Sequence, residues 1–161
     1  MEYFTHSEKD LITLGKKLAA NFKAGDVVLL SGNLGAGKTT FTKGVAQYFG
    51  IKKNITSPTF SLMNVYPVKS AGGRALKGQF NRVNQLGTNN LEIRTLVHID
   101  TYRLENEEKL LEIGAEDYLG STDTVCLIEW PEKLKKLLKN KKIVKINIEH
   151  LDAGRKVIIN D

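Results

Sequence analysis

Apolar residues along this chain recur with two spacings, one typical of helices and one typical of buried strands. Residues 7–22 carry an apolar residue every three or four positions, which predicts an amphipathic helix capped by Ser7. Its apolar face consists of Leu11, Leu14, Leu18 and Phe22. Residues 27–31 form a continuous apolar run, which predicts a buried strand. Residues 40–49 return to helical spacing and end at Gly50, a natural helix stop.

The alternation of strands and helices continues through the second half of the chain. Three apolar runs predict strands, at residues 59–65, 96–100 and 124–129. Two segments with helical spacing predict a short helix and a basic helix, at residues 105–113 and 131–138. Two final segments predict a C-terminal hairpin with its turn at 152–154, at residues 143–149 and 155–160.

Residues 67–95 interrupt this pattern. They contain four glycines and four asparagines and show little periodicity, which predicts a long loop or hairpin-like insertion. We find no internal repeat and no second domain, so residues 1–161 are predicted as one domain. Strands alternating with helices predict a three-layer α/β fold with a mostly parallel central sheet and the C-terminal hairpin at its end.

Composition adds limits on the class of protein. The 161 residues are 41% apolar and 26% charged, as in globular domains that bury a sizeable core. No apolar run approaches the ~20 residues that span a membrane, and the N-terminus lacks the pattern of a secretory signal. The single cysteine, Cys126, excludes an internal disulfide and is expected to be a buried, inert thiol. We therefore expect a cytoplasmic protein without membrane segments.

The net charge of +6 is unevenly distributed. Residues 133–145 carry seven lysines and no acid, and residues 67–95 carry five basic residues against Glu92. Such segments can attract nucleic acid or an acidic partner. They can equally be a solvated helix face and a loop, and the sequence leaves both interpretations open.

The most specific motif spans residues 32–39, whose sequence GNLGAGKT matches the phosphate-binding pattern G-x-x-x-x-G-K-[ST] at every fixed position. It lies between a predicted strand and a predicted helix, which is the context the motif requires. The glycines allow backbone N–H groups to surround phosphate oxygens, and the helix N-terminus adds positive partial charge. Lys38 can reach the terminal phosphates and Thr39 can hold Mg²⁺, so a glycine turn that binds nothing is a poor alternative.

Carboxylates at strand ends are candidates to complete a magnesium site. Asp100 and Glu129 each follow a buried strand, and either can contact Mg²⁺ while the other orients water or a ligand. Thr39 with one carboxylate is sufficient, because Mg²⁺ keeps several waters. Residues 56–60 (TSPTF) can offer a hydroxyl to a nucleotide or form an ordinary turn. Trp130 can cover the site or pack in the core.

Four segments in order resemble the bacterial TsaE (YjeE) family. They are GNLGAGKTTF (32–41), SPTFSLMNVY (57–66), HIDTYRL (98–104) and IEWPEKL (128–134). The resemblance runs from about Ser7 to Arg155 and implies ATP binding and slow Mg²⁺-dependent hydrolysis. It also implies action with TsaD and TsaB, which transfer a threonylcarbamoyl group to an adenosine beside the anticodon of tRNA. The family does not perform that transfer, and its ATPase cycle is thought to reset the complex.

The resemblance also implies roles for individual residues. Thr39 and Glu129 become metal ligands, Asp100 a carboxylate for hydrolysis, and Thr59 a switch hydroxyl. The residues implied in phosphate and nucleotide binding are Asn33, Leu34, Gly35, Ala36, Gly37, Lys38, Thr39, Thr40, Glu8, Trp130, Gly154 and Arg155. Two features depart from the family pattern: Asn33 stands where many relatives carry an acid, and the 67–95 connection is longer than usual.

Two other functions remain open on the residues alone. A small nucleotide or metabolite kinase would use the same loop, although no arginine-rich lid is evident. An RNA-binding module with a vestigial nucleotide site would use the basic segments. Phe80 is the single aromatic residue in those segments, so no base-stacking platform is evident. We expect the lysines at 133–145 to contact tRNA or an acidic partner, directly or indirectly.

Overall fold

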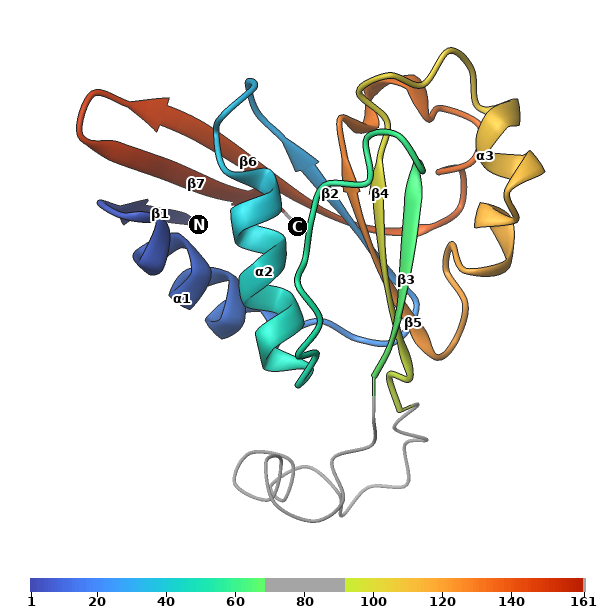
Figure 1. Ribbon diagram of the computed structural model, residues 1–161, viewed down its shortest axis with the longest axis horizontal. Helices are drawn as coiled ribbons and strands as arrows, with labels where there is room; N and C mark the ends of the chain where they lie inside the picture. The colour runs from blue at the N-terminus through green and yellow to red at the C-terminus, as the bar shows by residue number, and fades with distance from the viewer. Residues whose placement is uncertain (69–91, 161) are drawn as a thin grey trace.

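The structure, a computed structural model, describes residues 1–68 and 92–160. Within these ranges seven strands form one sheet in the order β1-β7-β6-β2-β5-β4-β3 (Figure 1). Their bounds are β1 Glu2–Thr5, β2 Asp26–Ser31, β3 Met63–Pro67, β4 Thr95–Asp100, β5 Thr124–Glu129, β6 Lys142–Leu151 and β7 Gly154–Asn160. The four central strands β6, β2, β5 and β4 are parallel, and antiparallel strands flank them. The α/β class with a mostly parallel sheet core is confirmed.

Helical segments cover both faces of the sheet and form the two outer layers of the fold, with the sheet between them (Figure 1). They are α1 Glu8–Ala19, α2 Lys38–Tyr48, α3 Glu108–Glu112 and the short 3-10 turns η1 Ala115–Asp117 and η2 Pro131–Lys133. One apolar cluster joins α1 and α2 to the sheet, and a second joins the segment around α3 to its other face. Alternate residues of β2 serve the two clusters, as a strand buried on both faces requires.

Two glycines bring α1 and α2 almost into backbone contact. A Cβ at Gly44 would lie 2.1 Å from the Ile12 carbonyl oxygen, and one at Gly15 would lie 2.4 Å from the Phe41 carbonyl oxygen. Any side chain at either position would push the helices apart. This close crossing fixes the start of α2, which is the helix that follows the glycine-rich loop.

Several predicted bounds change in the structure. Strand β1 was not predicted: it has four residues at the edge of the sheet and no clear alternation. The predicted strand 59–65 begins only at Met63, because Leu62 adopts a positive φ of 62°. The predicted helix 105–113 shortens to α3. The C-terminal hairpin is confirmed, with Leu151 paired to Gly154 across its turn.

The predicted basic helix at 131–138 is wrong. Only η2 is helical, and Leu134 leaves helical geometry at φ −100° and ψ 67°. The Glu107 carboxylate accepts backbone N–H bonds from Lys135, Lys136 and Leu137 at 2.5–3.1 Å. These N–H groups are therefore used by a distant side chain. The lysines of this region lie at the end of η2, on irregular backbone and on β6.

The 67–95 connection joins two antiparallel neighbours in the sheet. Pro67 of β3 pairs with Thr95 of β4, and the Val68 N–H donates to the Arg94 carbonyl at 2.8 Å. Of the insertion predicted at residues 67–95, residues 69–91 lie outside the described residues.

Two expectations about the chain as a whole can be compared with the described residues. Cys126 is fully buried, and burial raises the pKa of its thiol to about 12, as expected for an inert cysteine. None of the helices that the structure describes combines the length and apolar character needed to cross a membrane.

Candidate functional site

The glycine-rich segment forms a tight loop between β2 and α2. Gly37 precedes α2 with φ 107° and provides no side-chain cap, so the first N–H groups of the helix lack a capping side chain. Gly32 has φ 137°, and a Cβ there would lie 2.2 Å from the Ile148 carbonyl oxygen. The loop therefore needs glycine at both positions, and its shape leaves a helix N-terminus available to an anion.

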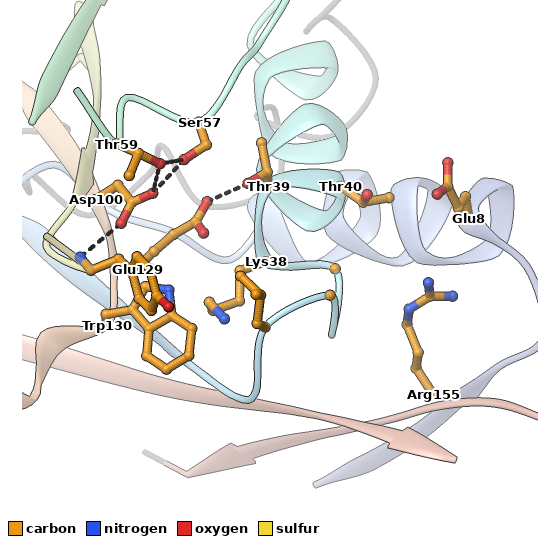
Figure 2. Close-up of a pocket in the computed structure, with 14 residues that line it drawn as sticks. Glu8, Lys38, Thr39, Thr40, Ser57, Thr59, Asp100, Glu129, Trp130 and Arg155 are labelled. Carbon is orange, nitrogen blue, oxygen red and sulfur yellow. Dashed lines mark hydrogen bonds between the residues drawn. The ribbon is translucent and has the colours of Figure 1, made fainter. Parts of the chain in front are cut away.

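A cavity of about 380 Å³ opens beside this loop. Loop and α2 residues, the ends of β4 and β5, and the starts of α1 and β7 surround it (Figure 2). Predicted site residues that line it are Glu8, Leu34, Gly35, Gly37, Lys38, Thr39, Thr40, Thr59, Asp100, Glu129, Trp130 and Arg155. Asn33, Ala36 and Gly154 belong to the surrounding backbone and do not line it. The fold thus brings together residues that are up to 147 positions apart in the sequence.

Glu129, at the end of β5, connects the loop side of the cavity to the core. Its Oε1 accepts a hydrogen bond from Thr39 Oγ1 at 2.8 Å, and the two side chains point toward each other (Figure 2). The same Oε1 lies 2.8 Å from Nε2 of His98, which is fully buried on β4. The Glu129 residue is only 3% exposed. A hydroxyl and a carboxylate are thus already adjacent, and both are oxygen donors of the kind Mg²⁺ prefers.

Asp100, at the end of β4, has a different set of partners. Its Oδ2 accepts hydrogen bonds from Ser57 Oγ and, at 2.7 Å, from Thr59 Oγ1, while Oδ1 accepts the Tyr102 N–H at 2.9 Å. The two hydroxyls also bond each other at 2.8 Å. The carboxylate therefore orders the segment that precedes β3, and it does not contact Thr39.

Lys38 lies between the loop and Trp130. Its Nζ donates to the carbonyls of Gly32 at 2.6 Å and Asn33 at 3.0 Å. The ammonium also lies 3.9 Å from the centroid of the Trp130 ring, a cation–π contact. Burial lowers the pKa of this ammonium, and the negative charge of Glu129, then of Asp100 and Glu132, opposes that shift. Lys38 is therefore held in a partly desolvated site where an anionic ligand would stabilise its charge.

Trp130 contributes its ring to the cavity because its backbone adopts φ 59°. The Thr101 hydroxyl donates to the Trp130 carbonyl, and the Trp130 N–H donates to the Leu30 carbonyl at 3.3 Å. The Tyr102 ring packs 5.0 Å from the indole. Trp130 thus both packs and lines the cavity, so the two alternatives left open by the sequence are compatible.

The far end of the cavity is formed by Glu8 and Arg155 (Figure 2). Arg155 Nε donates to the Ala36 carbonyl at 2.8 Å and so fastens β7 to the loop. Gly154 starts β7 at φ 117°, and a Cβ there would lie 2.1 Å from the Thr5 carbonyl oxygen. Gly154 is therefore required by the approach of β1, and Arg155 is the member of the pair that reaches the cavity.

Tyr102 and His98 were missed from the sequence, and Ser57 was predicted only as part of the segment at residues 56–60. Ser57 and Tyr102 line the cavity, and His98 bonds Glu129 from beneath it. Ser57 and Tyr102 lie within two residues of the predicted residues Thr59 and Asp100, and that proximity is a usable signal. His98 shares the side of β4 that carries Asp100, because alternate residues of a strand face the same way. Among the described residues no group of three or more His, Cys, Asp or Glu side chains forms a metal cluster.

The lysines at 133–145 lie apart from the cavity. Lys133 Nζ donates to the Leu104 carbonyl at 2.5 Å, and Lys142 forms an ion pair with Asp26 at 2.5 Å. The side chains of Lys135, Lys136 and Lys139 are exposed. Part of this run therefore stabilises the fold, and part presents positive charge to solvent.

Comparison with known proteins identifies the family. The family model described as "Threonylcarbamoyl adenosine biosynthesis protein TsaE" matches residues 5–157. The tRNA threonylcarbamoyladenosine biosynthesis protein TsaE of Rickettsia conorii is 34% identical over 153 residues, covering 94% of this chain and 73% of that protein. The protein of the same name from Haemophilus influenzae is 33% identical over 155 residues, covering 93% and 82%.

A solved structure shares the fold. The crystal structure of YdiB from Bacillus subtilis superimposes with a TM-score of 0.68 at 27% identity, covering 99% of this chain and 83% of that one. The glycine-rich loop, the two strand-end carboxylates and the cavity between them therefore occur in a chain that belongs to the TsaE family of threonylcarbamoyl adenosine biosynthesis proteins.

Proposed function

We propose that this chain is a Mg²⁺-dependent ATPase that supports threonylcarbamoyladenosine modification of tRNA together with TsaD and TsaB, without performing the transfer itself. One observation carries the proposal: Thr39, at the start of α2, bonds Glu129 directly beside the ammonium of Lys38 in a single cavity. A nucleoside triphosphate with its metal is bound by groups of these kinds: a helix N-terminus, a lysine, and a hydroxyl beside a carboxylate.

The phosphates would bind where the loop backbone and Lys38 converge. In the structure Lys38 Nζ is held by two loop carbonyls, Gly32 and Asn33. Phosphate oxygens are stronger partners for an ammonium than neutral carbonyls, because the bond is then charged on both sides. Lys38 would therefore turn from the loop to the terminal phosphates and stabilise the charge that spreads over the transferring group.

Thr39 and Glu129 fit a magnesium ion by the chemistry of their donors. Both present oxygen atoms, and they are already brought within hydrogen-bond distance by α2 and β5. When bound with ATP, magnesium would neutralise negative charge on the phosphate oxygens. Few protein ligands are needed, because Mg²⁺ retains several waters.

Asp100 is proposed to hold the attacking water. Its carboxylate lines the cavity and is oriented by Ser57 and Thr59. A carboxylate with fixed hydrogen bonds can accept a proton from water or align it for attack in line with the leaving oxygen. Thr59 would act as a switch hydroxyl, since it can exchange its bond to Asp100 for one to the nucleotide.

The remaining lining residues are proposed to bind the rest of the nucleotide. Glu8 and Arg155 form the end of the cavity away from Lys38, and Thr40 lies between the two ends (Figure 2). Trp130 offers an aromatic face beside Lys38. Asn33, Leu34, Gly35, Ala36 and Gly37 would supply the loop backbone, and Gly154 would place Arg155.

The exposed lysines are proposed to contact tRNA or an acidic partner surface in the cytoplasm. The test replaces Lys135, Lys136 and Lys139 with glutamine and measures tRNA binding across a salt series. We expect weaker binding and a salt slope reduced by about one for each lost phosphate contact. A control with Lys16, Lys17 and Lys23 replaced has the same change in charge on exposed positions elsewhere. Equal effects in both variants would show that the segment has no specific role.

The function is tested by phosphate release from Mg·ATP, with the protein alone and with TsaD and TsaB from the same organism. We expect slow release that requires Mg²⁺ and rises when the partners are added. ATP turnover that ignores the partners and places the phosphoryl group on a small-molecule acceptor, in place of free phosphate, would instead establish a kinase. RNA binding without nucleotide binding or turnover would establish an RNA-binding module.

A further inference from the structure

We propose that His98 is a positioning residue that fixes the carboxylate of Glu129 for metal binding. His98 Nε2 lies 2.8 Å from Glu129 Oε1, and Glu129 in turn bonds Thr39. This inference rests on the function proposed above, in which Glu129 holds the metal. The inference gives a role in the site to a buried residue of β4 that does not itself line the cavity.

The position of His98 in the core has an energetic cost. Its imidazole is fully buried, and its neighbours along and across the strands include the fully buried Leu96 and Leu127. Nδ1 of the ring is buried without a hydrogen-bond partner among the described residues. Burying an unpaired polar atom is unfavourable, and an apolar side chain would fill the same space at no such cost. Among the described residues the one polar contact of the ring is with Glu129, and this contact is what an apolar side chain could not supply.

The two ring nitrogens indicate which one carries the proton. With hydrogen on Nδ1, that N–H would be buried without an acceptor, and the Nε2 lone pair would face a carboxylate oxygen. With hydrogen on Nε2, the ring donates to Glu129 Oε1, and only a lone pair is left unpaired at Nδ1. The second arrangement keeps the strong charge-assisted bond and leaves the weaker group unsatisfied. His98 is thus a donor to Glu129.

The bond from His98 restricts the carboxylate to one orientation. Oε1 accepts from both Thr39 and His98, whereas Oε2 accepts no hydrogen bond in the part of the chain that the structure describes. Thr39 is itself a proposed metal ligand, so its hydroxyl cannot be counted on to orient Glu129 once a metal is bound. His98 is fully buried on β4, between β5 and β3, and is not itself a proposed metal ligand, so its bond can persist. Donors of this kind hold ligands in place and tune their affinity.

The same strand also sets the second carboxylate. His98 and Asp100 are two residues apart on β4 and therefore lie on the same face of the sheet. In the β4–β5 register Asp100 is paired with Glu129. One strand thus contributes one carboxylate directly and orients the other through an imidazole, so a shift of β4 would change both.

Three variants test the proposal. His98→Leu removes the donor and keeps an apolar body, and His98→Gln keeps an N–H donor on a flexible chain. Val97→Ala weakens the same strand from its other face, where Val97 packs in the second apolar cluster. Each variant is assayed for Mg²⁺ dependence of phosphate release and for thermal stability. Binding of Mn²⁺ with a non-hydrolysable ATP analogue is followed by electron paramagnetic resonance, which does not depend on turnover.

We expect His98→Leu to weaken Mn²⁺ binding and to raise the half-saturating Mg²⁺ concentration about 10-fold to 100-fold. His98→Gln should recover part of this loss, and Val97→Ala should lower thermal stability with wild-type metal dependence. Equal metal affinity in His98→Leu and the wild type would overturn the proposal. A wild-type protein without Mg²⁺-dependent binding or turnover would instead overturn the proposed function, so the two failures are distinguishable.

A second measurement covers the case in which His98→Leu does not fold. Nitrogen-15 NMR of the histidine rings in the wild-type protein reports which nitrogen carries hydrogen. We expect hydrogen on Nε2 of His98 and a change in that signal in Glu129→Gln. Hydrogen on Nδ1 with none on Nε2 would overturn the proposal, because His98 could then not donate to Glu129.

Discussion

The ends of β5 and β4 carry two carboxylates that match in position and differ in partners. Glu129 and Asp100 are paired in the sheet register and are each 3% exposed. Glu129 bonds Thr39 of α2 and His98 of the core, whereas Asp100 bonds Ser57 and Thr59 of the segment before β3. Two carboxylates at paired positions of the sheet can therefore serve different roles. In our proposal the hydrogen-bond donors distinguish the two roles, with the metal on Glu129 and the attacking water on Asp100.

Burial lowers the pKa of Lys38, and the negative charges of both carboxylates oppose that shift. Loss of this lysine should have the largest effect on turnover. We expect Lys38→Ala to lower phosphate release at least about 1000-fold, since a charge that stabilises the transferring phosphate is lost. The melting temperature should change little, because removal of a buried ammonium offsets the loss of its two hydrogen bonds. Phosphate-release assays and thermal unfolding on the same preparation provide the test. Unchanged turnover would contradict the mechanism for both carboxylates.

The comparison itself is tested by Glu129→Gln and Asp100→Asn. We expect Glu129→Gln to lower turnover about 100-fold to 1000-fold and to raise the Mg²⁺ requirement, because it removes a charged ligand. Asp100→Asn should lower turnover with the Mg²⁺ requirement unchanged. Turnover measured across a Mg²⁺ series separates the two effects. An equal shift of the Mg²⁺ requirement in both variants would erase the distinction between them.

The donors to Asp100 should give a smaller effect. Thr59→Val removes one hydroxyl with little change in shape, and Ser57→Ala removes the other. We expect each to lower kcat about 10-fold, the value of one hydrogen bond to a charged group, with no change in Mg²⁺ dependence. Steady-state kinetics provide the measurement. A loss of metal binding in either variant would show that the segment serves Glu129 as well.

A third carboxylate, Glu107, bonds backbone N–H groups away from the cavity, and its loss should have the smallest effect on turnover. Desolvation raises its pKa, but backbone N–H groups of Lys136, Leu137 and Lys135 outweigh this, so the pKa lies below the usual 4.5. A carboxyl group with a lowered pKa stabilises the fold above the unfolded-state pKa and loses that contribution as pH falls through the folded-state value. We expect Glu107→Ala to lose about 1 kcal/mol of stability at neutral pH, with unchanged turnover.

Denaturant unfolding at several pH values measures the stability lost in Glu107→Ala. The stability difference between wild type and Glu107→Ala should shrink as pH falls below 4.5. A difference that persists in acid would show that the carboxylate charge is not what fastens the segment at residues 135–137. Altered turnover at neutral pH would show that this surface communicates with the cavity.

The parts of the site that could be predicted from the sequence are determined by residues that are close together in the chain. The loop at residues 32–37 needs glycine at fixed positions and is followed at once by a helix, so its pattern is local. Glu129 and Asp100 follow apolar runs, and the ends of parallel strands meet at one edge of the sheet. The sequence could not decide between these two carboxylates, because the decision depends on side chains about 30 to 90 residues away.

The parts that were missed depend on distant contacts or on weak patterns. The segment at 131–138 has helical spacing, but the Glu107 carboxylate binds its backbone and prevents a helix. Strand β1 is short and lies at the sheet edge, where burial leaves little pattern in the sequence. His98 is a single polar residue in an apolar run, and only the structure shows that it faces Glu129.

A crystal structure with a non-hydrolysable ATP analogue and Mn²⁺ would show whether Thr39 and Glu129 hold the metal while Asp100 does not. Anomalous scattering would locate the ion. We expect Mn²⁺ between Thr39 and Glu129, bound directly or through one water, with the phosphates on Lys38 and the loop. An ion on Asp100, with the Thr39–Glu129 hydrogen bond still intact, would contradict this expectation.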